Sequence, residues 1–305
     1  MKVGLVSLGC AKNLVDSEMV LALFSESGFT IVNDPQDADV IVINTCGFIE
    51  SSKQESIENI LSMTQYKKKL VVIGCLVERY IEDLKKEIPE VDLWIPLRQY
   101  DHMKELINGL FDEPEVKLEL SPFRRFYSTP WYSAYLRISE GCDNRCTYCA
   151  IPLIRGGFRS RPLDELKHEA EILANKGIKE VVVISQDTTR YGHDFKPKSD
   201  IVDLLQMLLS FPQFAYIRLL YLYPDEISDN LIDLIAKEPR LTPYFDLPIQ
   251  HASSKVLKAM HRRGDKTFLK ALMEKIRSRV PNAILRTTLI VGFPGETEED
   301  FNELM

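Results

Sequence analysis

Six cysteines are the most reactive side chains of this 305-residue sequence, and they fall into two groups of three. The groups are Cys142, Cys146 and Cys149, and Cys10, Cys46 and Cys75. Structural disulfides are rare in compartments that keep thiols reduced, and the N-terminus lacks the charged and apolar regions of a signal peptide. Metal or redox chemistry is therefore the favoured use of these thiols.

The second half of the chain carries three cysteines within one short segment, Cys142–Cys149, separated by three and by two residues. This spacing lets one loop wrap a cuboidal 4Fe–4S cluster, with each sulfur reaching a different iron. Such a cluster has four irons, so one iron is left without a protein ligand. A zinc ion is the alternative, but it needs a fourth cysteine or histidine nearby. The nearest histidine downstream is His168, in the middle of a predicted helix, so the spacing favours the cluster.

The other three cysteines each follow directly an apolar segment that is predicted to be a strand. The segments are Val3–Gly9, Val40–Thr45 and Leu70–Gly74. In a parallel sheet the carboxyl ends of the strands lie along one edge, where α/β domains build their sites. Buried core cysteines are the alternative, since free cysteine is often buried. Three such positions out of three favour a second cluster, again with an open iron.

Residues 1–112 alternate apolar runs with helical patterns, which is typical of a parallel α/β domain. The predicted strands are Val3–Leu8, Val40–Asn44 and Leu70–Gly74, and the predicted helices are Val15–Ser25, Ser52–Thr64 and Arg79–Glu87. Ser51 and Ser52 are candidate helix N-caps, and Gly28 is a candidate helix stop.

Residues 113–133, with three prolines, are predicted to be a linker, and residues 134–305 a second αβ series. The strands predicted there are Tyr135–Ser139, Glu180–Ser185, Tyr216–Tyr221, Tyr244–Leu247 and Ile284–Val291, and the helices are Leu163–Lys176, Ile201–Leu209, Glu226–Lys237 and Lys266–Arg279. Five strands alternating with helices indicate part of a (β/α) barrel. Because Glu296–Met305 reads as a helix that has just begun, we expect this barrel to be incomplete.

The bulk composition narrows the class of protein. The net charge is −7, which argues against a dedicated nucleic-acid binder, because phosphate binding needs clustered positive charge. The sequence has no apolar run of about 18 residues, so no membrane-spanning helix is expected. These features predict a soluble, cytoplasmic protein.

The cysteine loop, following the first strand of a partial barrel and with Tyr148 before its last cysteine, resembles the radical S-adenosylmethionine (SAM) superfamily. The resemblance implies that Cys142, Cys146 and Cys149 hold a 4Fe–4S cluster whose open iron chelates the amino and carboxylate groups of SAM. Reduction of that cluster cleaves SAM to methionine and a 5′-deoxyadenosyl radical, which abstracts hydrogen from an unreactive carbon. The cofactors supply the hard chemistry, and the protein orients and shields it.

An N-terminal α/β domain with three such cysteines, joined to a radical SAM core, resembles the methylthiotransferases over essentially the whole chain. The resemblance implies a flavodoxin-like first domain and a second 4Fe–4S cluster on Cys10, Cys46 and Cys75 that carries the sulfur. SAM serves both as methyl donor and as radical source, and an electron donor such as flavodoxin or ferredoxin is implied. The family continues into a small C-terminal β-barrel TRAM domain, which is absent from this sequence.

The residues of several motifs resemble those of the branch of the family that modifies an aspartate. They are Leu8–Glu18, Ile138–Cys142, Ser185–Thr188, Tyr191-Gly192 and Pro248–Ser253. The resemblance implies as substrate the β-carbon of an aspartate in small-subunit ribosomal protein twelve. The branch that modifies transfer-RNA adenosine is the alternative, although its Gly-Cys-Gln-Met-Asn and Gln-Ser-Gly-Ser motifs are missing here.

The resemblance to the radical SAM superfamily implies further SAM contacts at strand ends, within the cysteine loop and just after it. They are Tyr148, Ser185, Gln186, Arg155 and Gly292. Strand-end turns and surface salt bridges are the alternatives for these residues. His251 is predicted to face the same site from another strand end, whereas His261–Arg263 is predicted to be a solvated helix end.

Overall fold

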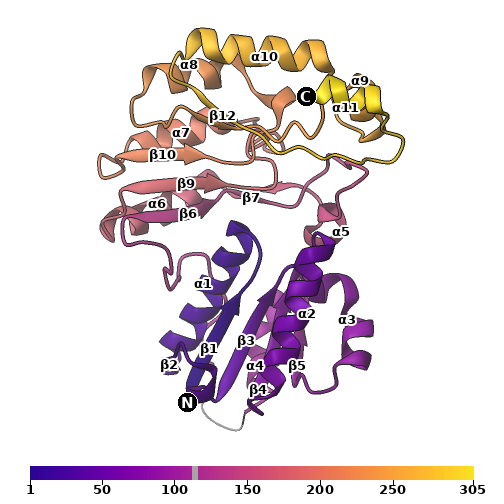
Figure 1. Ribbon diagram of the computed structural model, residues 1–305. Coiled ribbons are helices and arrows are strands. Elements are labelled where there is room, and N and C mark those ends of the chain that lie inside the picture. The colour runs from indigo at the N-terminus through magenta and orange to yellow at the C-terminus, as the bar shows by residue number, and fades with distance from the viewer. Residues whose placement is uncertain (112–115) are drawn as a thin grey trace. The chain divides into compact units, whose positions relative to one another are not determined.

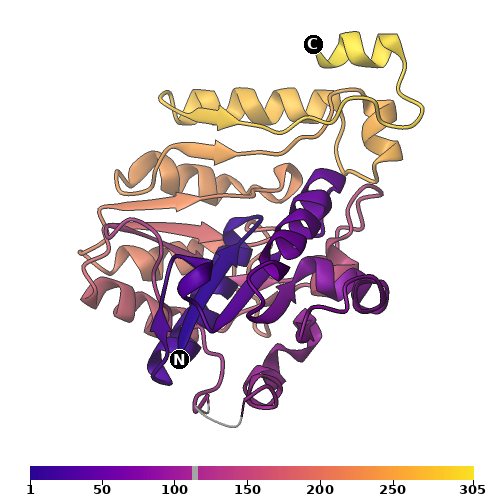
Figure 2. The same cartoon turned by 60° about the horizontal axis from the view of Figure 1, so that its bottom comes forward.

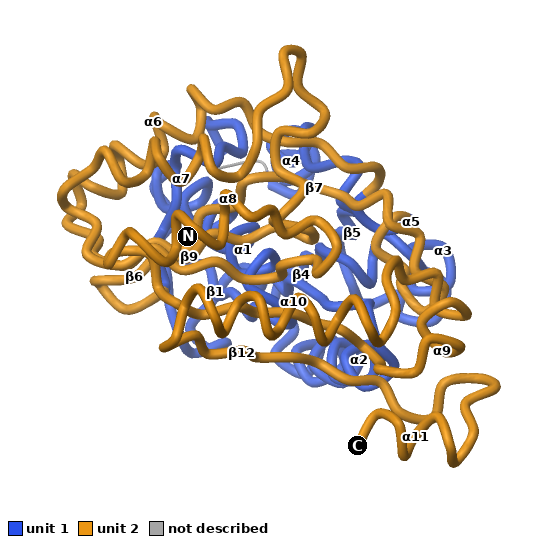
Figure 3. Tube along the Cα trace, turned by 90° about the horizontal axis from the view of Figure 1, so that it is seen from above, with its two compact units in different colours: residues 1–128, 153–155 blue, residues 129–152, 156–305 orange. Residues whose placement is uncertain are grey.

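The computed structural model describes residues 1–111 and 116–305, which form two compact units (Figures 1 and 3). Unit 1 contains the described residues up to Ser128 together with Leu153–Arg155, and unit 2 contains Thr129–Pro152 and Gly156–Met305. The predicted domain boundary between residues 112 and 113 lies outside the described residues. The part of the predicted linker that runs from residue 116 to Ser128 belongs to unit 1.

Unit 1 is built on a parallel sheet of five strands in the order β2-β1-β3-β4-β5. The strands are β1 (Lys2–Ser7), β2 (Thr30–Ile31), β3 (Val40–Thr45), β4 (Lys69–Gly74) and β5 (Leu93–Ile95). This is the flavodoxin-like strand order, so the predicted fold class is confirmed. The sequence patterns missed β2 and β5, because strands of two and three residues are too short to show a periodic pattern.

Helices connect the strands of unit 1. They are α1 (Ala11–Glu26), α2 (Glu50–Thr64), α3 (Cys75–Glu87) and α4 (Met103–Asn108), with 3₁₀ turns η1 (Pro35–Asp37) and η2 (Leu97–His102). The prediction that Ser51 or Ser52 caps α2 is wrong, because the cap position is Ile49 and both serines lie inside the helix. Gly28, with φ +92°, follows the end of α1 as predicted.

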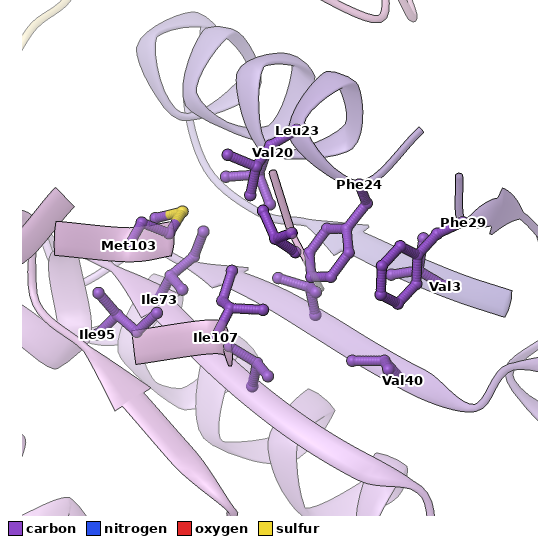
Figure 4. Close-up of a cluster of buried hydrophobic side chains, with 13 residues drawn as sticks. Val3, Val20, Leu23, Phe24, Phe29, Val40, Ile73, Ile95, Met103 and Ile107 are labelled. Carbon is purple, nitrogen blue, oxygen red and sulfur yellow. The ribbon is translucent and has the colours of Figure 1, made fainter. Parts of the chain in front are cut away.

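The two faces of the unit 1 sheet bury alternate side chains of the same strands. Val40 and Val42 of β3 pack with Phe24 of α1 and Ile107 of α4 on one face (Figure 4). Ile43 of β3 belongs to the opposite core, which α2 and α3 cover. A parallel strand buried on both faces is held by two cores at once, so the turns at its carboxyl end rest on a rigid support.

Most strands of unit 2 are parallel and connected by helices, and in Figure 2 the strands β6, β9, β10, β11 and β12 follow one another in chain order. Its elements are β6 (Ser133–Arg137), β7 (Ser139–Glu140), α5 (Ile151–Arg155), β8 (Arg159–Ser160), α6 (Leu163–Asn175), β9 (Glu180–Ile184), α7 (Ile201–Leu209), β10 (Tyr216–Leu219), η3 (Pro224–Glu226), α8 (Asp229–Lys237), β11 (Tyr244–Asp246), α9 (Ser254–Ala259), α10 (Lys266–Arg279), β12 (Ile284–Arg286) and α11 (Glu298–Leu304). Of these, α5 ends in the three residues that belong to unit 1.

Pairing in unit 2 runs β6-β9-β10 in one sheet and β11-β12 in another, both parallel, and β7 and β8 form a short antiparallel pair. The backbone N–H of Leu222 donates to the carbonyl of Asp246 at 2.9 Å and links the end of β10 to β11. The predicted alternation of strands and helices is therefore confirmed. The predicted end of the last strand at Val291 is wrong, because β12 ends at Arg286 and only Leu289 pairs beyond it, with Gln250.

Among the residues that the structure describes, we find no helix with the length and apolar character needed to cross a membrane.

Candidate metal centres

Cys10, Cys46 and Cys75 lie at the carboxyl ends of three adjacent strands of unit 1, β1, β3 and β4. The turns that carry them touch one another. A Cβ atom at Gly9 would lie 2.9 Å from the Cβ of Cys46, and one at Gly47 would lie 3.0 Å from the carbonyl carbon of Cys75. All three thiols are free, with Cys10 exposed and the other two buried. The structure thus brings together the three cysteines that the sequence scatters.

Asn13 is a fully buried residue of α1 that joins two of these strand ends. Its Nδ2 donates to the carbonyl of Leu8 at 3.1 Å and to that of Thr45 at 3.0 Å. Its Oδ1 lies 3.4 Å from the sulfur of Cys75. Sequence reasoning missed this residue, although it belongs to the motif of residues 8–18. Asn13 holds the β1 and β3 turns in register beside a candidate ligand.

The turn after β3 is held by two further side chains. The backbone N–H of Cys46 donates to Ser56 Oγ at 3.0 Å, and that hydroxyl donates to the carbonyl of Cys46 at 2.9 Å. Arg79 Nη1 donates to the carbonyl of Gly47 at 2.6 Å. These bonds fix the backbone of the turn that carries Cys46, in the way that outer-shell groups orient metal-binding residues.

Arg155 lies in unit 1, although it follows the cysteine loop of unit 2 in sequence. Its Nη2 lies 2.8 Å from both Asp16 Oδ2 and Asn13 Oδ1, and 3.7 Å from the sulfur of Cys75. Burial raises the pKa of the Cys75 thiol to about 11, and the charge of Arg155 opposes this shift. Of the residues predicted to bind SAM, Arg155 is the one that the structure groups with unit 1.

The loop with the other three cysteines follows β6 and β7 in unit 2. The backbone N–H of Cys142 donates to the carbonyl of Gly156 at 3.1 Å, and that of Cys149 donates to the carbonyl of Cys146 at 3.0 Å. Gly141 has φ +74°, and a Cβ there would lie 2.1 Å from a backbone oxygen. Only glycine tolerates that combination, so the residue before the first cysteine is fixed by close backbone packing.

The thiols of this loop are near enough to influence one another. Burial raises the pKa of Cys142 to about 11, against a hydrogen bond from the Asn144 backbone, and the neighbouring Cys149 and Cys146 act in the same direction as burial. Over residues 1–111 and 116–305, no three Cys, His, Asp or Glu side chains are placed to share a single metal ion. In a 4Fe–4S cluster each thiolate bonds a different iron, so the three sulfurs need not converge on one point.

Two tyrosines, Tyr148 and Tyr223, and one arginine lie beside Cys146. Tyr223 Oη lies 3.5 Å from its sulfur, and Arg262 Nη1 lies 4.0 Å from it. Burial raises the pKa of Tyr223 and that of Tyr148 above the ordinary tyrosine value, so both phenols stay protonated. The prediction that His261–Arg263 is a solvated helix end is wrong for Arg262, which is only 9% exposed, because its guanidinium packs on the Tyr223 ring.

Two predicted SAM-binding residues, Ser185 and Gln186, follow β9 directly. The hydroxyls of Ser185 and Ser139 share a hydrogen bond. Gln186 Nε2 donates to Glu140 Oε1 at 2.8 Å, while its Oε1 is buried without a hydrogen-bond partner among the described residues. Because Glu140 precedes the cysteine loop by two residues, this strand end lies beside that loop.

Asp187 joins the same strand end to the inside of the cysteine loop. Its carboxylate accepts from Asn144 Nδ2 at 2.7 Å and from Thr189 Oγ1 at 2.8 Å. Burial raises the pKa of Asp187, and these two hydrogen bonds oppose the shift. Sequence reasoning gave Asp187 and Asn144 no role, although both stand in quoted motifs. They hold the loop at the carboxyl end of β9.

Gly292 lies in an exposed turn, with φ +78° and no atom within 4 Å of a Cβ built on it. The turn is closed by Glu296, whose Oε2 accepts from the backbone N–H of Phe293 at 2.8 Å and whose Oε1 lies 3.4 Å from Nε2 of buried His251. The hydrogen bond from Phe293, and then the contact with His251, lower the pKa of Glu296. His251 thus helps to hold the turn that carries Gly292.

Two family models match the chain. Residues 2–96 match Uncharacterized protein family UPF0004, and residues 136–305 match the Radical SAM superfamily. Among solved structures, the fold is similar to the radical SAM methyltransferase TsrM from Kitasatospora setae (14% identity, 99% of this chain, 72% of that chain, TM-score 0.68). It is also similar to the cobalamin-dependent SAM radical enzyme OxsB (13% identity, 99% of this chain, 51% of that chain, TM-score 0.66). At such low identities these likenesses show the fold alone.

Two relatives are far more similar in sequence. Each is named ribosomal protein uS12 methylthiotransferase RimO. The relative from Alkaliphilus oremlandii is 49% identical, over 100% of this chain and 70% of its own length. The relative from Aquifex aeolicus is 49% identical, over 100% of this chain and 68% of its own length. With both cysteine groups in place, these matches show that the chain belongs to the RimO family of radical SAM methylthiotransferases.

Proposed function

We propose that this chain adds a methylthio group to the β-carbon of an aspartate in ribosomal protein uS12, and that its two cysteine groups hold two 4Fe–4S clusters. The substrate follows from the relatives, which are named for uS12 at 45–49% identity. The observation that most supports a second cluster is the geometry of unit 1, in which Cys10, Cys46 and Cys75 lie on touching turns.

A radical SAM enzyme uses SAM and a 4Fe–4S cluster, and the cluster supplies the electron that cleaves SAM to a carbon radical. Cys142, Cys146 and Cys149 are the ligands proposed here. The Tyr223 hydroxyl lies 3.5 Å from the Cys146 sulfur and would donate a hydrogen bond to it once that sulfur is a thiolate ligand. Because the loop is bonded to β9 through Asp187, its ligands are positioned before cofactor binds.

SAM presents an amino group, a carboxylate and an adenine to the protein. The unpartnered oxygen of Gln186 is an acceptor for the SAM amino group, since a buried amide oxygen is costly to leave unpaired. Ser185 lies next to it in sequence and Tyr148 lies within the cysteine loop, so these are further proposed contacts. Gly292, in an open turn after β12, is proposed to leave room for the adenine.

The second cluster is proposed for Cys10, Cys46 and Cys75. Three thiols leave one iron of a cubane without a protein ligand, and that iron is where a sulfur donor would be carried. Asn13 and Ser56 hold the ligand-bearing turns in place. Flavodoxin or ferredoxin is proposed as the electron donor, and the cytoplasm as the place of action.

Counting iron in the anaerobically reconstituted 305-residue chain tests the two clusters. We expect about eight irons per chain, about four in a variant with Cys10, Cys46 and Cys75 all changed to alanine, and about four when the other three are changed instead. A wild-type count of about four that the first set of substitutions leaves unchanged would refute the second cluster.

Mass spectrometry tests the substrate. A strain that lacks its own uS12 methylthiotransferase is complemented with the gene for this protein, and uS12 is then measured. We expect uS12 to gain the mass of one methylthio group, and Cys146→Ala to abolish the gain. A methylthio group found on transfer RNA instead, with uS12 unmodified, would show that the substrate assignment is wrong.

A further inference from the structure

Arg262 is a buried arginine next to one of the proposed cluster ligands. Its guanidinium carbon lies 3.7 Å from the centre of the Tyr223 ring, and its Nη2 donates to the carbonyl of Pro248 at 2.8 Å. Its Nη1 lies 4.0 Å from the sulfur of Cys146. The backbone N–H of Arg262 donates to the carbonyl of Leu257 at 2.8 Å, which fixes the residue just after α9. The guanidinium therefore has a defined position.

The charge of Arg262 has no carboxylate to balance it at short range. Among the described residues, no ion pair within 4.0 Å joins Arg262 to an acidic side chain. Asp225 is near enough to interact electrostatically with Arg262, but its Oδ2 is bound by Arg263 Nε at 2.6 Å. An arginine cannot lose its proton, and a buried charge without a counter-ion is costly. A negatively charged group beside Arg262 would therefore stabilise its buried charge.

The next residue in the chain gives the opposite picture. The side chain of Arg263 is 52% exposed, and its Nη2 also lies 2.7 Å from Glu226 Oε1. Solvent and two carboxylates therefore balance its charge. The two neighbouring arginines differ in burial and in charge balance, and only the buried one lies within 4.0 Å of a cysteine sulfur.

We propose that Arg262 is a positioning residue beside the SAM-cleaving cluster. The cluster balances the positive charge of Arg262, and that charge raises the reduction potential of the cluster. The inference rests on the proposed assignment of Cys146 as a ligand of that cluster. Reduction adds one electron from the donor, and no proton moves in this step. A buried positive charge a few ångströms from a ligand sulfur stabilises the more negative, reduced form. Tyr223 holds the guanidinium by stacking. Its hydroxyl would donate a hydrogen bond to the Cys146 sulfur as a thiolate ligand, which acts in the same direction.

A redox titration followed by electron paramagnetic resonance tests this role. It is run without SAM, in the full chain with Cys10, Cys46 and Cys75 changed to alanine, so that one cluster is observed. We expect Arg262→Gln to shift the midpoint potential to a more negative value. Arg262→Lys, which keeps the positive charge, should keep most of the original midpoint potential. Arg263→Gln is the matched comparison, and its midpoint should shift less than that of Arg262→Gln, because Arg263 touches the cysteine loop only through Asn144 Oδ1, at 3.2 Å, and is half exposed.

Three outcomes would overturn the inference. The midpoint of Arg262→Gln could equal that of the Arg263→Gln control. Arg262→Gln could weaken SAM binding while leaving the SAM-free midpoint unchanged, which would make it a SAM ligand. If Arg262→Gln loses its cluster, Tyr223→Phe replaces it as the probe, and an unshifted midpoint there overturns the inference. By contrast, a background variant that holds no iron at all would refute the ligand assignment itself.

Discussion

Replacing Arg155 with methionine should destabilise unit 1 strongly, although the residue follows the cysteine loop of unit 2 in sequence. Arg155 Nη2 and Asp16 Oδ2 are 2.8 Å apart, with side-chain exposures of only 4% and 3%. Arg155→Met removes this cation and leaves the buried carboxylate behind. It also removes the hydrogen bond to Asn13 and the contact with the Cys75 sulfur.

The size of the effect follows from burial. Removing one partner of a buried ion pair typically costs about 3 to 5 kcal/mol, because the remaining charge keeps its desolvation penalty. At 1.4 kcal/mol for each factor of ten, the folding equilibrium of unit 1 should fall by about two to three and a half powers of ten. In the double variant with Asp16→Leu, apolar groups replace both charges, so most of this loss should be recovered.

Urea unfolding of the metal-free chain provides the assay. The sequence has two tryptophans, Trp94 and Trp131. Trp94 is 6% exposed on β5 of unit 1, whereas Trp131 is 76% exposed in unit 2. With Trp131→Phe as the background, tryptophan fluorescence therefore reports on unit 1 alone.

The matched control is Arg124→Met, also in unit 1. Arg124 and Glu26 are 3.7 Å apart and about half exposed, with side-chain exposures of 48% and 46%. An exposed pair contributes at most about 1 kcal/mol, so this variant should unfold close to the wild-type midpoint. If Arg155→Met unfolds at the same urea concentration as Arg124→Met, the reasoning about the buried pair is refuted.

Two further changes test the cysteine sites. In the background that carries only the SAM-cleaving cluster, Gly141→Ala should lose most of its iron, because its Cβ would lie 2.1 Å from a backbone oxygen. Gly177 also has a positive φ, +83°, but no atom lies within 4 Å of a Cβ there. Gly177→Ala should therefore lower the free energy of unfolding by only about 1 kcal/mol and keep the iron. Equal iron retention in the two variants would contradict this reasoning. In the metal-free chain, Cys75, with its pKa raised from 9.0 to about 11, should hold about 100-fold less thiolate at pH 8 than a thiol with the unshifted value. Its alkylation should therefore lag far behind that of exposed Cys10 and accelerate up to about pH 11, and equal rates at pH 8 would contradict this.

Much of the fold could be predicted because it depends on local patterns. The alternating strands and helices and the flavodoxin-like class follow from apolar runs and from a resemblance over the whole chain. The helix caps at Ser51 and Ser52 were wrong because a capping residue type does not decide where the preceding chain turns. The edge strands β2 and β5 pair over only a few residues, so no periodicity marked them.

The cysteine sites divide in the same way. The grouping of the cysteines could be predicted, since Cys142–Cys149 has its own spacing and Cys10, Cys46 and Cys75 follow adjacent strands. The residues that surround the ligands could not. Arg262 and Arg263 are identical neighbours in sequence, yet one is buried against Tyr223 and the other is exposed. That difference arises from tertiary packing, which a single sequence does not display.

The two cysteine groups differ in how much of the chain must be ordered before a cluster can bind. Cys142, Cys146 and Cys149 lie within one loop, so a short segment can gather iron with little loss of chain entropy. Cys10, Cys46 and Cys75 follow three separate strands, with 35 and then 28 residues between successive cysteines. The proposed second cluster would cross-link the folded sheet of unit 1 and stabilise it, because unfolding would break its ligand set. Maturation should therefore be ordered, with the sheet formed first and iron delivered to unit 1 afterwards.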